Sequence, residues 1–267
     1  MSAQTWHYGV VARWWAEFNV DGGDELAWFQ PFVEAGQPAL DAACGTGRLL
    51  IPYLHAGLDV DGCDISSDML DLCRERAVRE GLPEPNLYAQ PTHELDLPRR
   101  YRTIFMCGAF GLGGDRAQDQ EGLRRLYEHL EPGGILLMDN EVPYASQWRW
   151  RFWTADGQNE LPQPWRSAGE HRTGSGGAAY ELRTRLVDID PLAQLVTTEM
   201  HALMWHDGEL VADEQHLLKM TVYFTDEIVL MLEGAGFAEI EVRGAYRDGP
   251  PTRADDFVVF SARRLRP

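Results

Sequence analysis

The sequence is poor in positive charge and in cysteine. It has 24 Lys and Arg residues against 42 Asp and Glu residues, which gives a formal net charge of −18, and Lys219 is its only lysine. This charge repels a phosphate backbone and an anionic membrane surface, so neither nucleic acid nor a membrane is an expected partner. The four cysteines have neither the paired spacing of metal ligands nor a secreted context, so we expect reduced thiols at Cys44, Cys63, Cys73 and Cys107.

Long apolar runs are also missing. No stretch of the sequence reaches the roughly 20 apolar residues of a membrane-spanning helix. Residues 1–7 lack the basic and apolar regions of a secretory signal, so a cytoplasmic protein is expected. The length of 267 residues is enough for one enlarged domain, which would bury about three quarters of the surface of its unfolded chain.

The most informative motif occupies residues 40–51. An apolar strand ends in an acid and a Cys-Gly-Thr-Gly turn, and a helix begins directly afterwards. Glycines at positions 45 and 47 let the backbone turn sharply and come close to a ligand. A dinucleotide-binding fingerprint needs a third glycine three residues after the second, and position 50 is Leu. The motif therefore predicts a cofactor-binding loop and disfavours a nicotinamide cofactor.

A second strand, over residues 57–66, ends at another acid. Its last carboxylate, Asp64, lies 17 positions beyond Gly47. A carboxylate in this place can accept hydrogen bonds from both hydroxyls of a ribose. Ser66 or Ser67 is suited to cap a helix that runs to about Glu80. The alternative for an isolated acid is an ordinary turn residue, but its distance from the glycine turn favours a ligand contact.

Strands and helices continue to alternate along the rest of the chain. The helical spacing of Leu123, Leu126, Tyr127 and Leu130 predicts a helix that stops at residues 131–134. This alternation indicates a doubly wound α/β fold. The other predicted elements are strands at 87–90, 103–108, 135–139, 239–242 and 257–262, and a helix from 224 to 236.

These features together resemble the class I S-adenosylmethionine-dependent methyltransferases. The likeness includes residues 40–48, Asp64, the turn at 132–134 and the segment 224–237, and it covers about residues 8–140 and 224–263. It implies a Rossmann-like, doubly wound, seven-stranded α/β sheet that ends in an antiparallel hairpin, with S-adenosylmethionine as the cofactor. By this resemblance, the cofactor contacts would be Tyr8, Asp41, Ala42, Ala43, Cys44, Gly45, Gly47, Asp64, Ile65, Met69, Gln90 and Cys107.

Two aromatic-rich regions lie outside the common fold. We expect a helical N-terminal cap at residues 1–32, the cofactor-binding core at 33–140 and 223–267, and a substrate-binding insertion or lid at 141–222. Alternating segments around 180–189, 196–205 and 216–224 predict antiparallel β-strands in this insertion after the fifth strand. The organisation is similar to the glycine N-methyltransferase group, in which such strands line the substrate site. For each single aromatic residue, a place in an ordinary core is the alternative.

The cofactor sets the chemistry that the resemblance implies. A sulfonium methyl group is transferred by in-line displacement, so the enzyme must hold the acceptor atom about 3 Å from the methyl group. A hydroxyl acceptor needs a general base, whereas an amine needs only to arrive deprotonated. The catalytic candidates are Glu141 and, second, His93, with a surface carboxylate and a solvated loop histidine as alternatives. Acceptor contacts are expected from Phe110, Tyr144, Trp148 and Tyr223.

A metal site is not expected. The pair Asp139-Asn140 resembles half of the magnesium site of catechol-type O-methyltransferases, but residues 107–110 supply no second carboxylate. The same segment lacks the Asp/Asn-Pro-Pro-aromatic motif of nucleobase-amine methyltransferases. The predicted function is methyl transfer from S-adenosylmethionine to an oxygen or nitrogen atom of a small-molecule metabolite, plausibly in secondary metabolism. A non-catalytic S-adenosylmethionine-binding regulatory or structural protein and a nicotinamide-dependent oxidoreductase are the alternatives.

Overall fold

The computed structural model describes residues 5–266, which form parts of two compact units. The predicted cap at residues 1–32 is divided between them, and its first four residues lie outside the described part. Helix α1 (Gly9–Phe18) belongs to the first unit and helix α2 (Gly23–Ala35) to the second. Of the described residues, the first unit comprises 5–20, 111–115 and 146–222, and the second comprises 21–110, 116–145 and 223–266.

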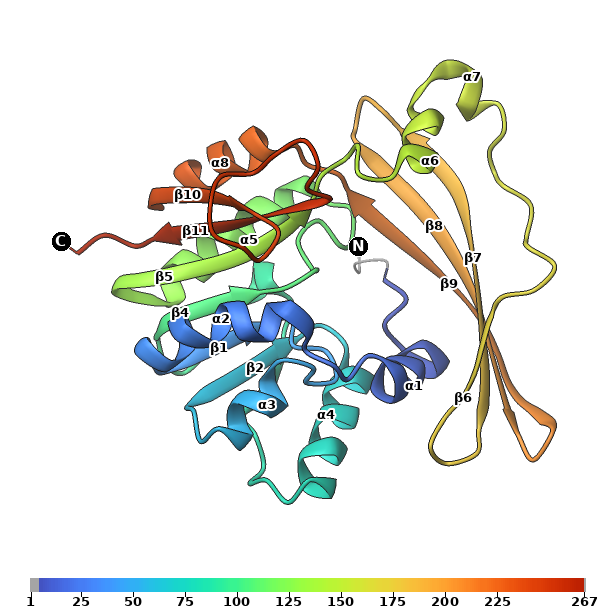
Figure 1. Cartoon of the computed structure of the whole chain (residues 1–267), viewed down its shortest axis with the longest axis horizontal. Helices are drawn as coiled ribbons and strands as arrows, with labels where there is room; N and C mark the ends of the chain where they lie inside the picture. The colour runs from blue at the N-terminus through green and yellow to red at the C-terminus, as the bar shows by residue number, and fades with distance from the viewer. Residues whose placement is uncertain (1–4, 267) are drawn as a thin grey trace. The chain divides into compact units, whose positions relative to one another are not determined.

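The second unit is built on a seven-stranded sheet with the order β10-β11-β5-β4-β1-β2-β3 (Figure 1). Strands β1 to β5 pair in parallel, while β11 runs antiparallel to both β5 and β10. The predicted doubly wound α/β sheet with its final hairpin is therefore confirmed. The order reverses between β1 and β4, and in such sheets ligands bind beyond the carboxyl ends of the strands at this point. The strands are β1 (Ala39–Ala42), β2 (Val60–Asp64), β3 (Leu87–Ala89), β4 (Tyr101–Met106), β5 (Leu130–Glu141), β10 (Ala238–Gly244) and β11 (Phe257–Arg263).

Helices cover both faces of this sheet. Successive strand residues point to opposite sides, so apolar residues that follow one another in a strand must be buried on both faces. In β4, Ile104 and Met106 pack in one apolar cluster with residues of α5 (Arg116–His129) and α8 (Thr225–Gly234). The intervening Phe105 packs in a second cluster with residues of α2, α3 and α4. Helix α3 spans Leu50–His55, and helix α4 spans Ser67–Arg79. A sheet buried on both faces explains the continuous apolar runs at residues 104–106 in β4 and 135–138 in β5.

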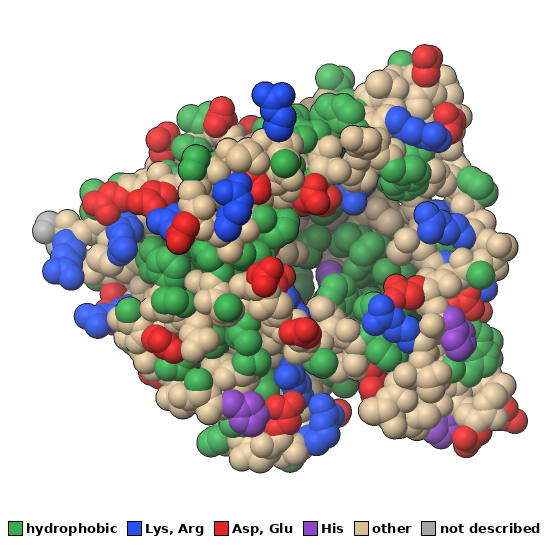
Figure 2. Space-filling model, in the orientation of Figure 1, with side chains coloured by type: hydrophobic (Ala, Val, Ile, Leu, Met, Phe, Trp, Pro, Cys, Tyr) green, Lys and Arg blue, Asp and Glu red, His purple; other side chains and the backbone are tan. Residues whose placement is uncertain are grey.

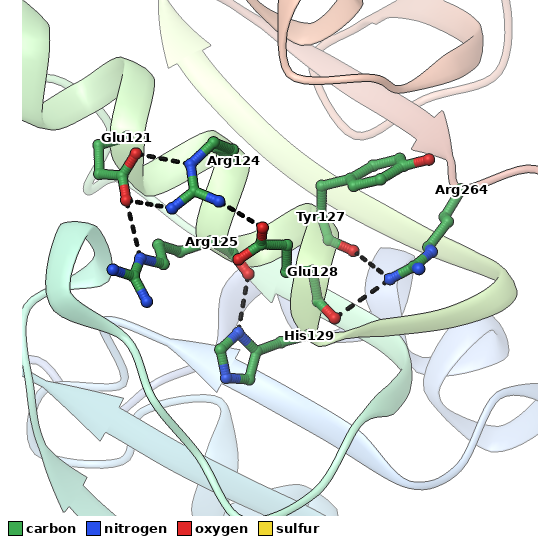
Figure 3. Close-up of polar contacts among 7 residues, drawn as sticks. All are labelled: Glu121, Arg124, Arg125, Tyr127, Glu128, His129 and Arg264. Atoms are coloured by element: carbon green, nitrogen blue, oxygen red, sulfur yellow. Dashed lines mark hydrogen bonds and ion pairs between the residues drawn. The ribbon is translucent and has the colours of Figure 1, made fainter.

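Helix α5 ends one residue earlier than its apolar spacing suggests, because Leu130 already pairs with Tyr101 in the sheet. The guanidinium of Arg264 donates to the carbonyl oxygens of Tyr127, Glu128 and Leu130 at 3.0, 3.1 and 2.9 Å. The carbonyls of Tyr127 and Glu128 belong to the last turn of the helix and lack partners within it. Figure 3 shows Arg264 beside Tyr127 and Glu128, and a row of ion pairs along the helix that links Glu121, Arg124, Arg125 and Glu128.

The first unit contains a four-stranded antiparallel sheet with the order β6-β7-β8-β9. Strands β7 (Ala179–Asp190), β8 (Leu195–His206) and β9 (Glu209–Thr221) confirm the predicted antiparallel insertion. Strand β6 (Glu170–Thr173) was missed because all four of its residues are exposed and give no apolar alternation. Helix α1 packs on this sheet through Val10 and Val11. Short helices occupy Gln147–Trp150 (α6), Arg151–Trp153 (η2) and Ala155–Gln158 (α7).

Acidic and basic side chains are interspersed on the face of the molecule shown in Figure 2. Ion pairs neutralise some of the carboxylates locally, as between Arg247 and Asp255, whose Nη2 and Oδ2 atoms lie 2.6 Å apart. Within residues 5–266, each helix is too short or too polar to cross a lipid bilayer.

Candidate active site

The loop after β1 contains two glycines in different surroundings. Both have positive φ angles, +54° at Gly45 and +81° at Gly47. A Cβ added to Gly47 would lie 2.6 Å from the sulfur of Cys73 and 2.7 Å from Cγ1 of Ile51. One added to Gly45 would meet no heavy atom within 4 Å. Gly47 therefore lets the loop pack on α3 and α4, whereas Gly45 leaves room for a ligand to approach the backbone.

Asp64 ends β2 and is joined to the same loop. Its carboxylate accepts hydrogen bonds from the backbone N–H groups of Gly45 at 2.9 Å and Ser66 at 2.8 Å. Ser66 in turn caps α4, since its hydroxyl oxygen accepts from the N–H of Met69 at 3.2 Å. Burial raises the pKa of Asp64, and the backbone N–H groups oppose this shift. A carboxylate has about four acceptor positions, so these bonds leave capacity for ribose hydroxyls.

Asp41 lies in β1 and is only 3% exposed. Burial raises its pKa to about 8, and the positive charge of Arg48 opposes this rise. Arg48 itself forms an ion pair with Glu25 at 3.3 Å and donates to the carbonyl oxygen of Gly22 at 3.3 Å. In the sequence, the cofactor loop is thus preceded by the buried Asp41 and followed by Arg48, which is bonded to the start of α2.

A further acid, the half-buried Asp139, connects the carboxyl ends of β4 and β5. Its carboxylate accepts from the backbone N–H of Gly108 and from the hydroxyl of Tyr246, both at 2.6 Å, and from the thiol of Cys107 at 3.6 Å. Burial raises the pKa of Asp139. Arg48 reaches the same cluster by donating to the sulfur of Cys107 at 3.2 Å.

Sequence reasoning considered Asp139 only as half of a metal site and gave no role to Tyr246. Tyr246 lies 107 positions away in the β10–β11 connection. The signal that was available for Asp139 was an acid at the end of an otherwise apolar strand. Among residues 5–266, no group of three or more His, Cys, Asp or Glu side chains is placed to hold a metal ion.

The predicted acceptor residues lie in different environments. Phe110 is half-buried and its ring centroid lies 5.1 Å from that of Tyr223. Tyr223 is fully buried, and its hydroxyl donates to Asp119 at 2.6 Å, so in this conformation it presents no surface to an acceptor. Tyr144 and Trp148 are 47% and 48% exposed. Trp148 belongs to the first unit, and the other three belong to the second.

The two catalytic candidates lie at the ends of strands in the second unit. Glu141 is the exposed last residue of β5, and the side-chain amide of Asn140 donates to its carbonyl oxygen at 2.9 Å. The same amide donates to the carbonyl oxygen of Tyr223 at 3.1 Å, which fixes the end of β5 to the start of α8. His93 lies in the short helix η1 (Thr92–Glu94), with Nε2 3.8 Å from Oε1 of Glu94.

Most of the other predicted cofactor residues occupy the ends of strands and the loops that follow them, whereas Met69 lies in the first turn of α4. Ala42 ends β1, Ala43 has a φ of 66°, and Cys44 is buried, which raises the pKa of its thiol. Ile65 is half-buried and Met69 is buried. The side-chain amide of Gln90 closes a small loop on the backbone of Asp96. Tyr8 precedes α1 in the first unit.

Residues 39–134 match the family model of a methyltransferase domain. These residues therefore form a methyltransferase domain, in agreement with the predicted resemblance to class I S-adenosylmethionine-dependent methyltransferases. This methyltransferase is 23% identical over 229 residues to a putative methyltransferase of Geobacillus sp. (strain WCH70), with 84% of this chain and 83% of the relative aligned. Over 124 residues it is 25% identical to the dTDP-3-amino-3,6-dideoxy-alpha-D-glucopyranose N,N-dimethyltransferase of Streptomyces fradiae, with 46% and 47% aligned.

Solved structures of methyltransferases share the fold. An S-adenosylmethionine-dependent methyltransferase from Clostridium acetobutylicum superposes with a TM-score of 0.71 at 17% identity, covering 96% of this chain and 98% of that one. The sugar N-methyltransferase KedS8 from Streptoalloteichus gives a TM-score of 0.66 at 20% identity, covering 99% and 98%. The described residues fit S-adenosylmethionine, because Gly45 leaves space at the loop and Asp64 retains acceptor capacity beside it.

Proposed function

We propose that this methyltransferase acts on a nitrogen or oxygen atom of a small-molecule metabolite, with an amine on a deoxysugar as the first acceptor class to test. The observation that carries the proposal is the exposed carboxylate of Glu141, two residues beyond the half-buried Asp139 at the carboxyl end of β5. An exposed acid at this edge can bind an ammonium group or accept a proton from a hydroxyl. Ligand sites of doubly wound folds lie at this edge of the sheet.

The names of related proteins support an amine. The Streptomyces fradiae relative is an N,N-dimethyltransferase of a nucleotide-linked amino sugar, and KedS8 is a sugar N-methyltransferase. An amine also makes the smaller chemical demand, since its lone pair attacks directly once the nitrogen is deprotonated. Secondary metabolism is the setting that this acceptor class suggests.

The cofactor-binding residues that we propose are those of the loops after β1 and β2. Gly45 would give the cofactor access to the backbone, and Asp64 would accept from the ribose hydroxyls. S-adenosylmethionine, when bound, supplies an electrophilic methyl group on a sulfonium. The protein's own tasks are to exclude water and to hold the acceptor atom in line with that methyl group.

We further propose that the insertion at residues 141–222 supplies acceptor contacts. Its chain leaves the second unit just after β5 and returns just before α8. Trp148 is half-exposed on α6, and its ring packs edge-on against the fully buried Phe152 with centroids 5.4 Å apart. A rigid, exposed aromatic of this kind offers an apolar surface to a sugar ring or an aromatic acceptor.

The test is methyl transfer from radiolabelled S-adenosylmethionine to paired acceptors that differ only in an amine or a hydroxyl at one ring position. We expect the amine to be methylated and its hydroxyl counterpart to react slowly. Hydrolysis of the cofactor is subtracted with a blank that lacks acceptor. A panel in which neither member is methylated by protein that binds the cofactor would contradict the proposed acceptor class.

Glu141→Gln separates the two roles of the strand-end acid. As a general base for a hydroxyl, Glu141 would contribute about 10²- to 10⁴-fold to kcat. As a partner for an ammonium group it would act on acceptor binding, so the larger change would appear in KM. An unchanged kcat/KM would reject both roles and leave an enzyme that works by positioning alone.

A further inference from the structure

Tyr246 holds an unusual backbone conformation close to the half-buried acid Asp139. Its φ is +39°, in the left-handed region that aromatic residues rarely adopt. Such a conformation costs free energy and persists only where the surroundings fix it. Its ring packs against Phe29 and Phe257, with centroids 5.8 and 4.9 Å away. The strained backbone directs the Tyr246 hydroxyl to the Asp139 carboxylate at 2.6 Å.

The connection that carries Tyr246 is fixed by further bonds. The guanidinium of Arg247 pairs with Asp255 at 2.6 Å, and its Nη2 also donates to the carbonyl oxygen of Pro250 at 3.4 Å. The backbone N–H of Gly244 donates to the carbonyl oxygen of Gly249 at 3.3 Å, which closes the loop. The loop therefore delivers the hydroxyl as a fixed donor.

Asp139 transmits this restraint to the turn after β4. One of its oxygens binds the Tyr246 hydroxyl, and the other binds the N–H of Gly108 at 2.6 Å. Gly108 has a φ of +65°, and a Cβ added to it would meet no heavy atom within 4 Å. The turn therefore has free space beside Gly108, and the Asp139 carboxyl group holds it by accepting the hydrogen bond from the Gly108 N–H. Cys107 joins it to the cofactor loop through the sulfur that accepts from Arg48.

We propose that Asp139 and Tyr246 are positioning residues for methyl transfer, which hold the turn Cys107–Phe110 in the geometry that the reaction requires. This role goes beyond the choice of acceptor, because the turn joins Cys107, a predicted cofactor contact, to Phe110, a predicted acceptor contact. A displacement of about 1 Å at such a turn is enough to slow an aligned displacement reaction by up to about 100-fold.

The amino end of the parallel strands offers a matched control for the substitution of Tyr246. Tyr101 is also a buried tyrosine, and its hydroxyl donates to the buried Asp61 at 2.8 Å. Tyr101→Phe and Tyr246→Phe each remove one tyrosine–carboxylate hydrogen bond and keep the ring. Only the second substitution acts on the turn that contains Gly108.

The experiment compares these two variants with Asp139→Asn. In Tyr246→Phe we expect the amide of Gly108, observed by NMR in glycine-labelled protein, to exchange about tenfold faster and to shift, because its acceptor is less firmly held. Tyr101→Phe should leave that amide unchanged. This readout needs no acceptor, so its result is independent of the proposed acceptor class.

The kinetic arm uses an acceptor found with the paired panel. Tyr246→Phe should lower kcat by about tenfold and leave the acceptor KM and the S-adenosylmethionine Kd within about twofold, since binding contacts are kept while alignment is lost. Adding Asp139→Asn to Tyr246→Phe should cost less than the two separate effects combined. Equal losses in the Tyr246 and Tyr101 variants, or a Gly108 amide that does not respond to Tyr246→Phe, would overturn the proposal. An altered amide with unchanged kcat would overturn it as well.

Discussion

Buried carboxylates lie at both the amino and the carboxyl ends of the parallel strands in the seven-stranded sheet. The groups that donate hydrogen bonds to them differ between the two ends. At the amino end, Asp61 is 1% exposed and is bound by the guanidinium of Arg99 through two hydrogen bonds of 2.8 and 2.7 Å. The hydroxyl of Tyr101 and the amide of Asn86 donate to the same carboxylate at 2.8 and 3.0 Å. Asp61 thus has a full set of donors, including a permanent cation.

At the carboxyl end, Asp64 and Asp139 are held by uncharged groups, while Asp41 is near the positive charge of Arg48. The hydrogen bonds described for Asp64 and Asp139 come from backbone N–H groups, a hydroxyl and a thiol. Burial raises the pKa of both carboxyls and that of Asp41. A buried negative charge that is not paired with a cation costs free energy unless a bound ligand supplies a positive charge or hydrogen-bond donors. The comparison indicates that the amino end supports the fold, while the carboxyl end suits a cationic, hydroxyl-bearing ligand such as S-adenosylmethionine.

The largest effect should come from Gly45→Val. A branched Cβ would enter the space at the loop and resist the positive φ, so we expect cofactor affinity to fall at least about 100-fold, or ~2.7 kcal/mol. Gly57→Val is the control, because Gly57 has a φ of +74° and equally open surroundings but lies before β2, at the amino end. Calorimetric titration with S-adenosylmethionine should show normal affinity for that variant. Similar losses in both would make backbone strain the cause and remove the ligand role of Gly45.

Arg99→Met tests the amino end of the strands, where we expect a loss of stability without a loss of cofactor affinity. Removal of the cation leaves Asp61 buried with its neutral donors, so we expect a loss of about 3 kcal/mol in the free energy of unfolding. Cofactor affinity should be unchanged where the variant is folded. Urea unfolding measures the first quantity and calorimetry the second. Weakened cofactor binding in stable protein would show that the two ends are coupled.

A pH-dependent effect on stability is expected from Asp41→Asn. Burial raises the pKa of Asp41 from 3.8 to about 8, so the folded state binds a proton that the unfolded state has lost. The stability that this proton gives is complete below pH 3.8 and is lost as the pH rises through about 8. Between these limits the native protein should lose up to about 1.4 kcal/mol per pH unit relative to the variant. Melting temperatures at pH 5, 7 and 9 test this, and a constant difference would contradict it.

Local sequence patterns predicted much of the fold and less of the site. The glycine turn, the Ser66 cap and the alternating elements were identifiable because each rests on neighbouring residues. The exposed strand β6 and the contact between Asp139 and Tyr246 could not be predicted, since one lacks apolar alternation and the other joins positions 107 apart. The full burial of Tyr223 likewise depends on the packing around it, including Phe110.

The central claim is that the acids at the carboxyl end serve the cofactor and those at the amino end do not. The most direct measurement is the S-adenosylmethionine affinity of Asp64→Asn beside that of Asp59→Asn, two variants with the same change in net charge. Asp59 pairs with Arg99 at 2.7 Å and is half-exposed, so its replacement should be tolerated. We expect Asp64→Asn to weaken binding by about 1 to 3 kcal/mol and Asp59→Asn to leave it unchanged. Equal affinities in the two variants, or a greater loss in Asp59→Asn, would contradict the account.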